Sequence, residues 1–503
     1  MAETVLTLSA MRAAGASSAS FQSSRNHTCT NDDLTCTPVS YTGRSLAPKM
    51  LRSRKEAPKM SDHVSVDQVK AEKTPVFLLQ ARERSAQRLT MAYVIAGLFF
   101  MLLPGTFLGV WNLISISGQR GAAISPAWIQ AHGHAQIFGW IGTFILGIGF
   151  YSIPKMAGRS SYSGARGWIA WILWIPGVLL RWAAGVYQWQ WRMALPVSAA
   201  LELAAFIIFF IAVRQHRPAD PKLKSKGLPV WIFSVLIGTV GFGVGLLMNL
   251  AGSIYVSTQA PTPAFPASFD GRFLALLAYG FIVPTVWGFS ARWLPVFLGL
   301  KPLAEPSLKL ALLLSITGVI LAQAGLFHTA PWLFAGAAIS SVAAFHFFGP
   351  AERPAKITGV HASFPVFIRV AYVWLVIATV LGICAAYLDH ANGWVGAARH
   401  ALTVGFIATM VFSIGQRVLP AFAGMRILYS PRLMLTCLLL LNIGCTLRVS
   451  SEVVAYEGYW APAWNLLPWS AICELAAVTV FAVNLLLTFK QPPAHEMKPA
   501  GAA

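Results

Sequence analysis

The sequence predicts an all-α membrane protein of twelve transmembrane helices. Of its 503 residues, 56% are hydrophobic and only 11% are charged, and long apolar runs recur along the chain. A soluble domain keeps a charged exterior, which this composition does not supply. An apolar run of about 20 residues crosses the hydrocarbon layer as a helix. A threefold internal repeat further predicts a pseudo-threefold arrangement of three four-helix units.

The chain divides into two tails and one apolar domain. Residues 1–88 are polar and contain no apolar run able to form a core, which predicts a disordered basic tail. Met60 is an alternative start of translation, and no secretory signal follows Met1. Residues 89–489 form the transmembrane domain, and 490–503 form a C-terminal tail. The expected spans are 90–115, 129–154, 167–187, 193–213, 228–250, 272–298, 308–327, 331–348, 368–388, 397–422, 431–451 and 465–489.

Lysine and arginine are distributed unevenly between alternate loops. The loops after the even-numbered spans carry fifteen, whereas the loops after the odd-numbered spans carry four. The positive-inside rule therefore predicts that both termini are cytoplasmic. The same distribution accounts for the net charge of +20, so that we expect membrane lipid and no nucleic acid as a partner.

One segment occurs three times. Arg399–Gly424 reads RHALTVGFIATMVFSIGQRVLPAFAG, and a copy 266 positions earlier ends at Gly158. A fainter copy lies between them and has Ala275 where the outer copies have histidine. The outer copies share His134/His400, Gly139/Gly405, Thr143/Thr409, Pro154/Pro420 and Gly158/Gly424, and the middle copy keeps Gly280, Pro295 and Gly299. The proline and glycine predict where each helix ends.

The repeat extends over neighbouring spans. Arg181 and Arg448 are 267 positions apart, and Glu202 and Glu474 lie in the related sequences SAALELAA and SAICELAA. The corresponding positions of the middle unit hold Ala322 or Gln323 and Ser341. Each outer unit thus has a histidine, an arginine and a glutamate that the middle unit lacks. We therefore expect the chemistry in units one and three.

The histidines are candidate metal ligands. A lone histidine near the end of a span is commonly a hydrogen-bonding residue. His134 and His400 at equivalent positions instead favour a shared role, and neutral imidazole is an axial ligand of haem iron. His132 lies about 200° around the helix from His134, so it would support that site or belong to a separate one.

The arginines have two interpretations that are compatible in part. Buried charges in a membrane are costly unless they are paired. Arg181 and Arg448 would accordingly form structural ion pairs with Glu202 and Glu474. Alternatively, the two arginines would bind the two propionates of a haem.

At these residues the chain resembles two related families. Twelve spans with a histidine on spans 2 and 10 are the frame of haem-copper oxidase subunit I, where those helices ligate the low-spin haem b. HGHAQIFGW, GRFLALLAYGFIVPTVWGFSARWLPVF and RHALTVGFIATM resemble the NnrS family more closely, over residues 75–489. That resemblance implies a bacterial inner-membrane protein associated with haem and copper and linked to nitric oxide and nitrosative stress. The family's first motif commonly reads His-x-His-Glu, and Ala135 stands here in place of the glutamate.

The comparison with the oxidases argues against oxygen reduction. Their binuclear centre needs histidines on spans 6 and 7 and a second histidine on span 10. Span 6 has none, span 7 has only His328 at its edge, and Ala398 and Leu402 flank His400 at two residues. We identify no copper site and no catalytic residue.

The expected function is therefore binding of one haem b in the response to nitric oxide, its buffering or its detoxification. Nitric oxide or another small diatomic molecule is the expected ligand, and any redox partner is unknown. An electron-carrying or oxidase-like respiratory subunit is one alternative. Another is a transporter that uses the same helical ring, with the arginines and glutamates as its polar lining.

Overall fold

The computed structural model describes residues 76–118, 124–156, 164–214 and 228–493. By its contacts the chain divides into Met1–Glu72 and Lys73–Ala503, and every described residue belongs to the second unit. Most of the predicted N-terminal tail, including the alternative start at Met60, therefore lies outside the described residues. Its last part does not: helix α1 begins at Val76, because the polar stretch before the first apolar run is rich in Gln, Arg, Ala and Glu, which favour helix.

The elements of the described residues are helices, and they follow the predicted units. Unit one consists of α1 (Val76–Phe100), η2 (Met101–Phe107), α2 (Leu108–Gly118), α3 (Pro126–His134), η3 (Ala135–Gly142), α4 (Thr143–Met156), α5 (Gly164–Tyr187) and α6 (Trp191–Arg214). Unit two consists of α7 (Val230–Gln259), α8 (Ala267–Ala275), η5 (Leu276–Ile282), α9 (Val283–Leu298), α10 (Glu305–Gln323) and α11 (Ala330–Phe345). Unit three consists of α12 (Phe364–Leu388), α13 (Gly393–His400), η6 (Ala401–Ala408), α14 (Thr409–Phe422), α15 (Pro431–Tyr456), η7 (Ala461–Asn465) and α16 (Leu467–Lys490).

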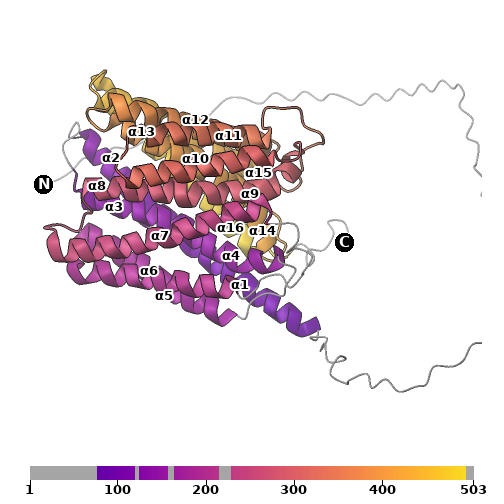
Figure 1. Cartoon of the computed structure of the whole chain (residues 1–503). Helices are drawn as coiled ribbons and strands as arrows, with labels where there is room; N and C mark the ends of the chain where they lie inside the picture. Colours follow the sequence, from indigo (N-terminus) through magenta and orange to yellow (C-terminus); the bar gives the residue numbers. More distant parts are fainter. Residues whose placement is uncertain (1–75, 119–123, 157–163, 215–227, 494–503) are drawn as a thin grey trace, which may run out of the picture. The chain divides into compact units, whose positions relative to one another are not determined.

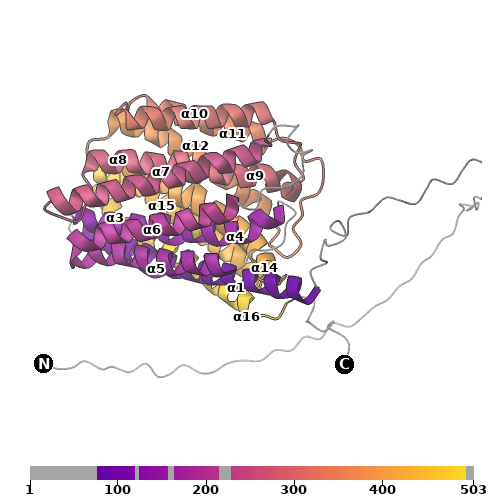
Figure 2. The ribbon, with the colours of Figure 1, turned by 60° about the horizontal axis from the view of Figure 1, so that its bottom comes forward.

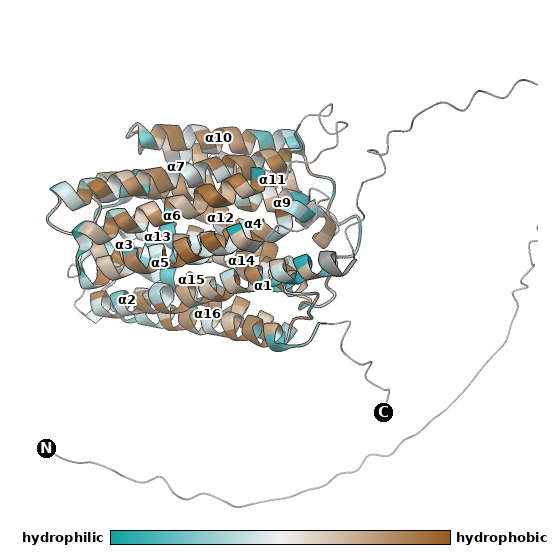
Figure 3. Cartoon of the chain, turned by 90° about the horizontal axis from the view of Figure 1, so that it is seen from below, coloured by the Kyte–Doolittle hydropathy of each residue, from teal (hydrophilic) through white to brown (hydrophobic). Residues whose placement is uncertain are grey.

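The prediction of an all-α membrane-spanning fold is confirmed. Within the described residues, 11 helices are long and apolar enough to cross a membrane. The remaining expected span, 331–348, corresponds to α11, whose 16 residues reach roughly 24 Å at the α-helical rise and fall short of a bilayer's hydrocarbon thickness. The helices lie side by side (Figure 1), with α10 and α11 along one edge and α1 and α16 along the opposite edge (Figure 2). Hydrophobic residues cover most of their length (Figure 3).

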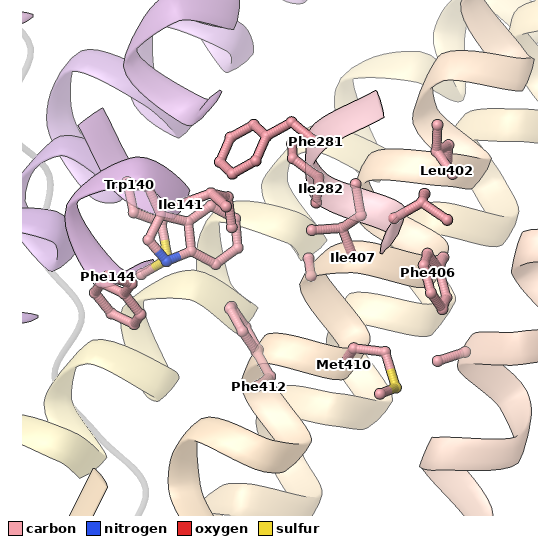
Figure 4. Packing of buried hydrophobic residues seen from close by; sticks show 14 of the residues in the cluster. Trp140, Ile141, Phe144, Phe281, Ile282, Leu402, Phe406, Ile407, Met410 and Phe412 are labelled. Atoms are coloured by element: carbon pink, nitrogen blue, oxygen red, sulfur yellow. The ribbon is translucent and has the colours of Figure 1, made fainter. Parts of the chain in front are cut away.

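The three copies of the repeated segment form the centre of the bundle. Their spans, Pro126–Lys155, Ala267–Leu298 and Gly393–Phe422, are 78%, 67% and 72% buried, against 39–56% for the other spans. Large apolar side chains from all three meet there, as Figure 4 shows for Trp140, Phe281 and Phe412. The Trp140 and Phe412 rings pack edge to face with centroids 6.0 Å apart. The helices that carry His134 and His400 are thus neighbours around a common axis.

Each copy of the repeat contains a π-helical segment at the same place. The π-helices η3, η5 and η6 begin directly after His134, Ala275 and His400. In the outer copies a shared threonine bonds to the carbonyl five residues earlier, Thr143 to Phe138 at 3.3 Å and Thr409 to Val404 at 3.4 Å. Such segments widen the helix by a residue per turn and recur at functional sites. The middle unit keeps this distortion without the histidine.

The third and fourth spans of each outer unit also approach each other at equivalent residues. A Cβ atom on Gly177 of α5 would lie 3.1 Å from Cγ of Glu202, and one on Gly444 of α15 would lie 2.8 Å from Cγ of Glu474. The two glycines are 267 positions apart, the same spacing as Arg181 and Arg448. The absence of a side chain at these points lets the backbones of α5/α6 and α15/α16 come close.

The predicted helix ends are found where they can be checked. Gly299 follows α9 with φ of 67° and Gly424 follows α14 with φ of 102°, a backbone region that glycine adopts without strain. The corresponding Gly158 lies outside the described residues. The three central helices therefore have a histidine end, where α3, α8 and α13 begin, and a proline–glycine end.

Candidate functional site

Buried polar residues gather at the histidine end of the bundle. His134 is 6% exposed, Glu202 0%, Arg181 4% and Arg448 8%. Charged and polar side chains at such positions are costly in an apolar bundle unless they find partners or serve a ligand. Their partners therefore distinguish packing from function.

His134 contacts the protein through Nε2 and through the face of its ring. Its Nε2 lies 2.8 Å from Oε1 of Glu202 on α6, and Nδ2 of Asn249 on α7 donates to the other carboxylate oxygen at 3.1 Å. The ring stacks on Phe138 with centroids 4.5 Å apart. This chain of contacts ties α3 to α6 and α7.

His132 points away from that cluster, toward η2. Its Nδ1 lies 2.8 Å from the carbonyl oxygen of Gly105. The neighbouring carbonyl of Pro104 accepts a bond of 3.2 Å from Nε1 of Trp182 on α5. Gly109 makes room for the imidazole, since a Cβ atom there would lie 2.6 Å from Cε1 of His132. The π-helical turn of η2 thus holds His132 by one ring nitrogen.

His400 is held in the same way as His132. Its Nδ1 lies 2.8 Å from the carbonyl oxygen of Gly396 and 3.0 Å from Oε2 of Glu452 on α15. Arg448 pairs with the same carboxylate, with Nη2 at 3.3 Å from Oε1. A carboxylate behind the distal nitrogen of an imidazole is typical of histidines that ligate metals.

The predicted ion pairs are replaced by others. Glu202 bonds to His134 and Asn249 rather than to Arg181, and Arg448 pairs with Glu452 rather than with Glu474. The guanidinium of Arg181 lies 4.5 Å over the Phe265 ring. Arg181 and Arg448 lie one turn after Gly177 and Gly444, the glycines that Glu202 and Glu474 approach. Each arginine therefore shares a helix face with the contact to its predicted partner, and the side-chain rotamers decide which carboxylate it meets.

Several buried polar atoms at this end lack a hydrogen-bond partner among the described residues. They include Nη1 of Arg181, Nε and Nη1 of Arg448, and Oε1 of Glu474. Leaving such groups unpaired in an apolar interior costs about 1–3 kcal/mol each. Buried guanidinium donors of this kind suit an anionic group supplied by a ligand.

The site residues fall into two groups. The charges of His132, His400 and Arg448 are close enough to interact, and Glu474 joins His400, Arg448 and Glu452 in the same region. The second group contains His134, Glu202 and Arg181, whose charge interacts with those of Glu202 and Asp270. The two histidines of α3 therefore serve different neighbourhoods.

Sequence analysis missed Asn249, Glu452 and Asp389. Glu452 follows Arg448 by four residues, a spacing at which helical side chains meet, so this partner was detectable. Asn249 gives only a weak signal, as an amide within an apolar run. Oδ1 of Asp389 accepts from the N–H groups of Trp394 at 2.8 Å and Val395 at 3.3 Å, and so caps the helix that carries His400.

Glu457 supports the same helix start. Its carboxylate accepts from the backbone N–H groups of His390, Ala391 and Gly393. Burial by itself raises the pKa of Glu457, but these donors outweigh it and hold that pKa below its ordinary value. The ionised carboxylate therefore stabilises the loop before α13 at neutral pH.

The other candidates have ordinary surroundings. His328 packs on Tyr387 with ring centroids 5.5 Å apart, and Nδ1 of His361 bonds to Ser363. Cys437 and Cys445 are buried free thiols. In the part of the chain that the structure describes, no three His, Cys, Asp or Glu side chains gather as ligands of a metal ion.

Comparison with known proteins agrees with this architecture. The sequence profile of the NnrS family, described as NnrS protein, matches residues 90–492. The chain belongs to the NnrS family. No curated protein is similar enough in sequence to count as a relative.

Among solved structures, the cryo-EM structure of a heme-copper terminal oxidase dimer is similar, with a TM-score of 0.61 and 12% sequence identity. The match covers 81% of this chain and 84% of the oxidase chain. At this identity the likeness concerns the fold, which confirms the predicted oxidase-like frame of this NnrS protein.

Proposed function

We propose that this NnrS protein binds one haem b at the histidine end of the bundle and acts in the response to nitric oxide, its buffering or its detoxification. Membership of the family supports the proposal, as does the oxidase-like fold. The observation that carries it is the set of groups poised for a ligand: His400 and His132, each held by Nδ1 alone, and the unpartnered buried donors of Arg448.

The residues present fit a haem. An imidazole that donates from Nδ1 to a carbonyl is in the tautomer that leaves the Nε2 lone pair free for iron. His400 would supply one axial ligand from α13, and a histidine of α3, His134 or His132, would supply the other. A haem held there would supply an iron centre that binds diatomic molecules and carries electrons.

The arginines would hold the propionates. Nε and Nη1 of Arg448 have no partner among the described residues, and the guanidinium lies in the region of His400. Arg181 is the candidate for the second propionate through its unpartnered Nη1. Paired arginine–carboxylate contacts would remove the cost of these buried charges.

Absorption spectroscopy of the purified full-length protein tests the proposal. We expect a Soret band with sharp α and β bands on reduction, and one haem per chain. His400→Ala should lose the haem or convert it to a high-spin form, whereas the matched control His328→Ala should keep the parent spectrum. A protein purified without haem that also fails to take up added haem would contradict the proposal.

One observation favours a second candidate function, which is transport. Polar atoms at the histidine end without partners, such as Oε1 of Glu474 and Oδ1 of Asn249, would also suit the polar lining of a transport route. Absence of haem from the spectrum would favour that function. An electron-carrying or oxidase-like respiratory subunit would instead show haem that a quinol or cytochrome donor reduces rapidly.

We further propose that the protein lies in the bacterial inner membrane with both termini in the cytoplasm. The lysines and arginines of alternate loops support this orientation. A reporter fused after residue 490 or within 214–226 should be cytoplasmic, and one within 251–270 should be external. The opposite pattern would invert the orientation and place the histidine end on the cytoplasmic side.

A further inference from the structure

Helix α3 offers two histidines on opposite faces, and a haem needs one of them. We infer that His132 is the axial ligand from α3 and that His134 anchors the helix to its neighbours. The inference rests on the proposed function and identifies the ligand pair as His132 and His400. Three observations carry it: the partners of His134, the geometry of His132, and the placement of His132 relative to His400.

The Nε2 atom of His134 already has a partner within the protein. Its Nε2 is held by Glu202 at 2.8 Å, and both side chains are almost completely buried. Ligation through Nε2 would strip a buried carboxylate of its closest partner, which is strongly unfavourable. Nδ1 is the poorer alternative for a planar macrocycle, because this ring nitrogen adjoins the carbon that carries the Cβ substituent.

His132 and His400 share the geometry that ligation requires. In each, Nδ1 lies 2.8 Å from a backbone carbonyl, that of Gly105 for His132 and that of Gly396 for His400. No protein partner for either Nε2 is found among the described residues. A carbonyl behind the distal nitrogen fixes the ring and its tautomer. The glycine at 109 leaves the space in which the His132 ring sits.

His132 lies beside elements that contact unit three, the unit that contains His400. His132 faces η2, and α16 of unit three packs against both η2 and α2. His400, Arg448 and Glu474 lie on α13, α15 and α16, and the charges of His400 and Arg448 reach His132. Glu202 and Asn249, the partners of His134, belong instead to α6 and α7. The His132 face of α3 therefore turns toward the elements that contact unit three, and the His134 face turns toward α6 and α7.

The ligand pair of His132 and His400 does not follow the internal repeat of the sequence. The residue of unit three that corresponds to His132 is Ala398, so the two ligands come from non-equivalent positions. They differ by two residues, or about 3 Å along a helix. His134 remains the repeat equivalent of His400 in sequence but has taken a structural role.

Substitution of each histidine in the full-length protein separates the two roles. His132→Met should replace the bis-histidine spectrum by that of histidine–methionine ligation, with the far-red absorption of a sulfur–iron bond in the oxidised protein. His132→Gly should lose most of the low-spin signal and recover it when imidazole is added. His134→Gln should keep a low-spin bis-histidine spectrum.

A second pair of variants leaves His132 in place: one variant crowds its ring, and the other is the control. Gly109→Ala places a methyl group 2.6 Å from Cε1 of His132 and should produce a high-spin fraction. Gly133→Ala is the matched control and should keep the parent spectrum. Gly133 lies on α3 beside His132, and a Cβ atom there meets nothing within 4 Å. Thermal unfolding of haem-free protein gives a further readout: His134→Gln should lower the midpoint by more than His132→Gln, because only His134 contacts a buried carboxylate.

The outcomes distinguish the inference from the proposed function. Loss of the low-spin signal in His134→Gln, together with a parent spectrum in the variants of His132 and Gly109, would overturn the inference while the haem proposal stands. A parent protein without haem would overturn the proposed function, and the unfolding midpoints would still report which histidine is the anchor. If all the variants of His132 and His134 lose haem alike, the failure of imidazole to rescue His132→Gly would overturn the inference.

Discussion

Units one and three carry the same three polar residues, yet they use them differently. In unit one the glutamate of the fourth span, Glu202, lies 2.8 Å from His134. In unit three the equivalent Glu474 leaves Oε1 without a partner among the described residues, and His400 contacts Glu452 instead. The difference shows that a repeat preserves where helices lie and cross, whereas each unit selects its own side-chain partners. Unit one pairs its glutamate with its histidine, whereas unit three leaves Oε1 of Glu474 and two donors of Arg448 without a partner among the described residues.

The largest expected effect comes from removing the two glutamates. Glu202→Leu should destabilise the haem-free protein by about 2–5 kcal/mol, because it leaves His134 and Asn249 without their buried partner. Glu474→Leu should be neutral or stabilising, since an apolar side chain replaces a carboxylate with an unpaired oxygen. Thermal unfolding in detergent measures both. Equal losses in the two variants would mean that the units are equivalent after all.

A smaller effect is expected from the glycines at the equivalent helix crossings. Gly444→Ala should cost about 1–3 kcal/mol as a case of overpacking, because its Cβ atom would lie 2.8 Å from Cγ of Glu474 and 3.0 Å from the carbonyl of Ser470. Gly177→Ala should cost less, since its nearest contact is 3.1 Å. The midpoint of thermal unfolding should fall in that order. The reverse order would show that α15 and α16 separate more easily than α5 and α6.

The middle unit can test whether a histidine at the repeat position is enough to bind a metal. Ala275→His places an imidazole directly before η5, where the outer units have His134 and His400. We expect a folded protein with one low-spin haem, at a cost of about 1–3 kcal/mol for the added volume. Haem and protein assays on the same sample give the stoichiometry. Two haems in the parent protein would contradict the account, because a complete second ligand set would then exist.

The smallest expected effect is that of the N-terminal tail. Deletion of residues 1–59 should leave membrane insertion and haem content unchanged, because the predicted transmembrane domain begins after this polar segment. Quantitative blotting of membrane fractions and the Soret absorbance per protein measure both properties. Failure of the truncated protein to insert would assign the tail a role in assembly.

The sequence was sufficient to predict the units and insufficient to predict the contacts. The spacings of His134/His400 and Arg181/Arg448 are visible as repeats, and each repeat corresponds to a helix position in the structure. Whether Arg448 reaches Glu474 or Glu452 depends on side-chain rotamers, because Glu452 lies one turn after Arg448 on α15 and Glu474 approaches Gly444, one turn before it. Repeat spacing contains no information about rotamers.

The histidines of α3 illustrate the same limit. The repeat draws attention to His134, because it has a counterpart in unit three, and away from His132, because Ala398 does not. The deciding facts are three-dimensional: the carbonyl of Gly105 in a π-helical turn and the carboxylate of Glu202 on another helix. A cluster of two histidines separated by one residue predicts two opposite faces, but not which face has a free nitrogen.

The π-helical segments η3, η5 and η6 separate the scaffold of the three units from their ligands. A π-helical turn is the mark of one extra residue accommodated within an α-helix, and here the extra residue stands at the same place in all three copies. The histidine stands in only two of them. The extra residue therefore belongs to the scaffold rather than to the ligand set. Shortening η5 by one residue would rotate the ends of the middle helix by about 100° relative to each other, with no loss of any candidate ligand.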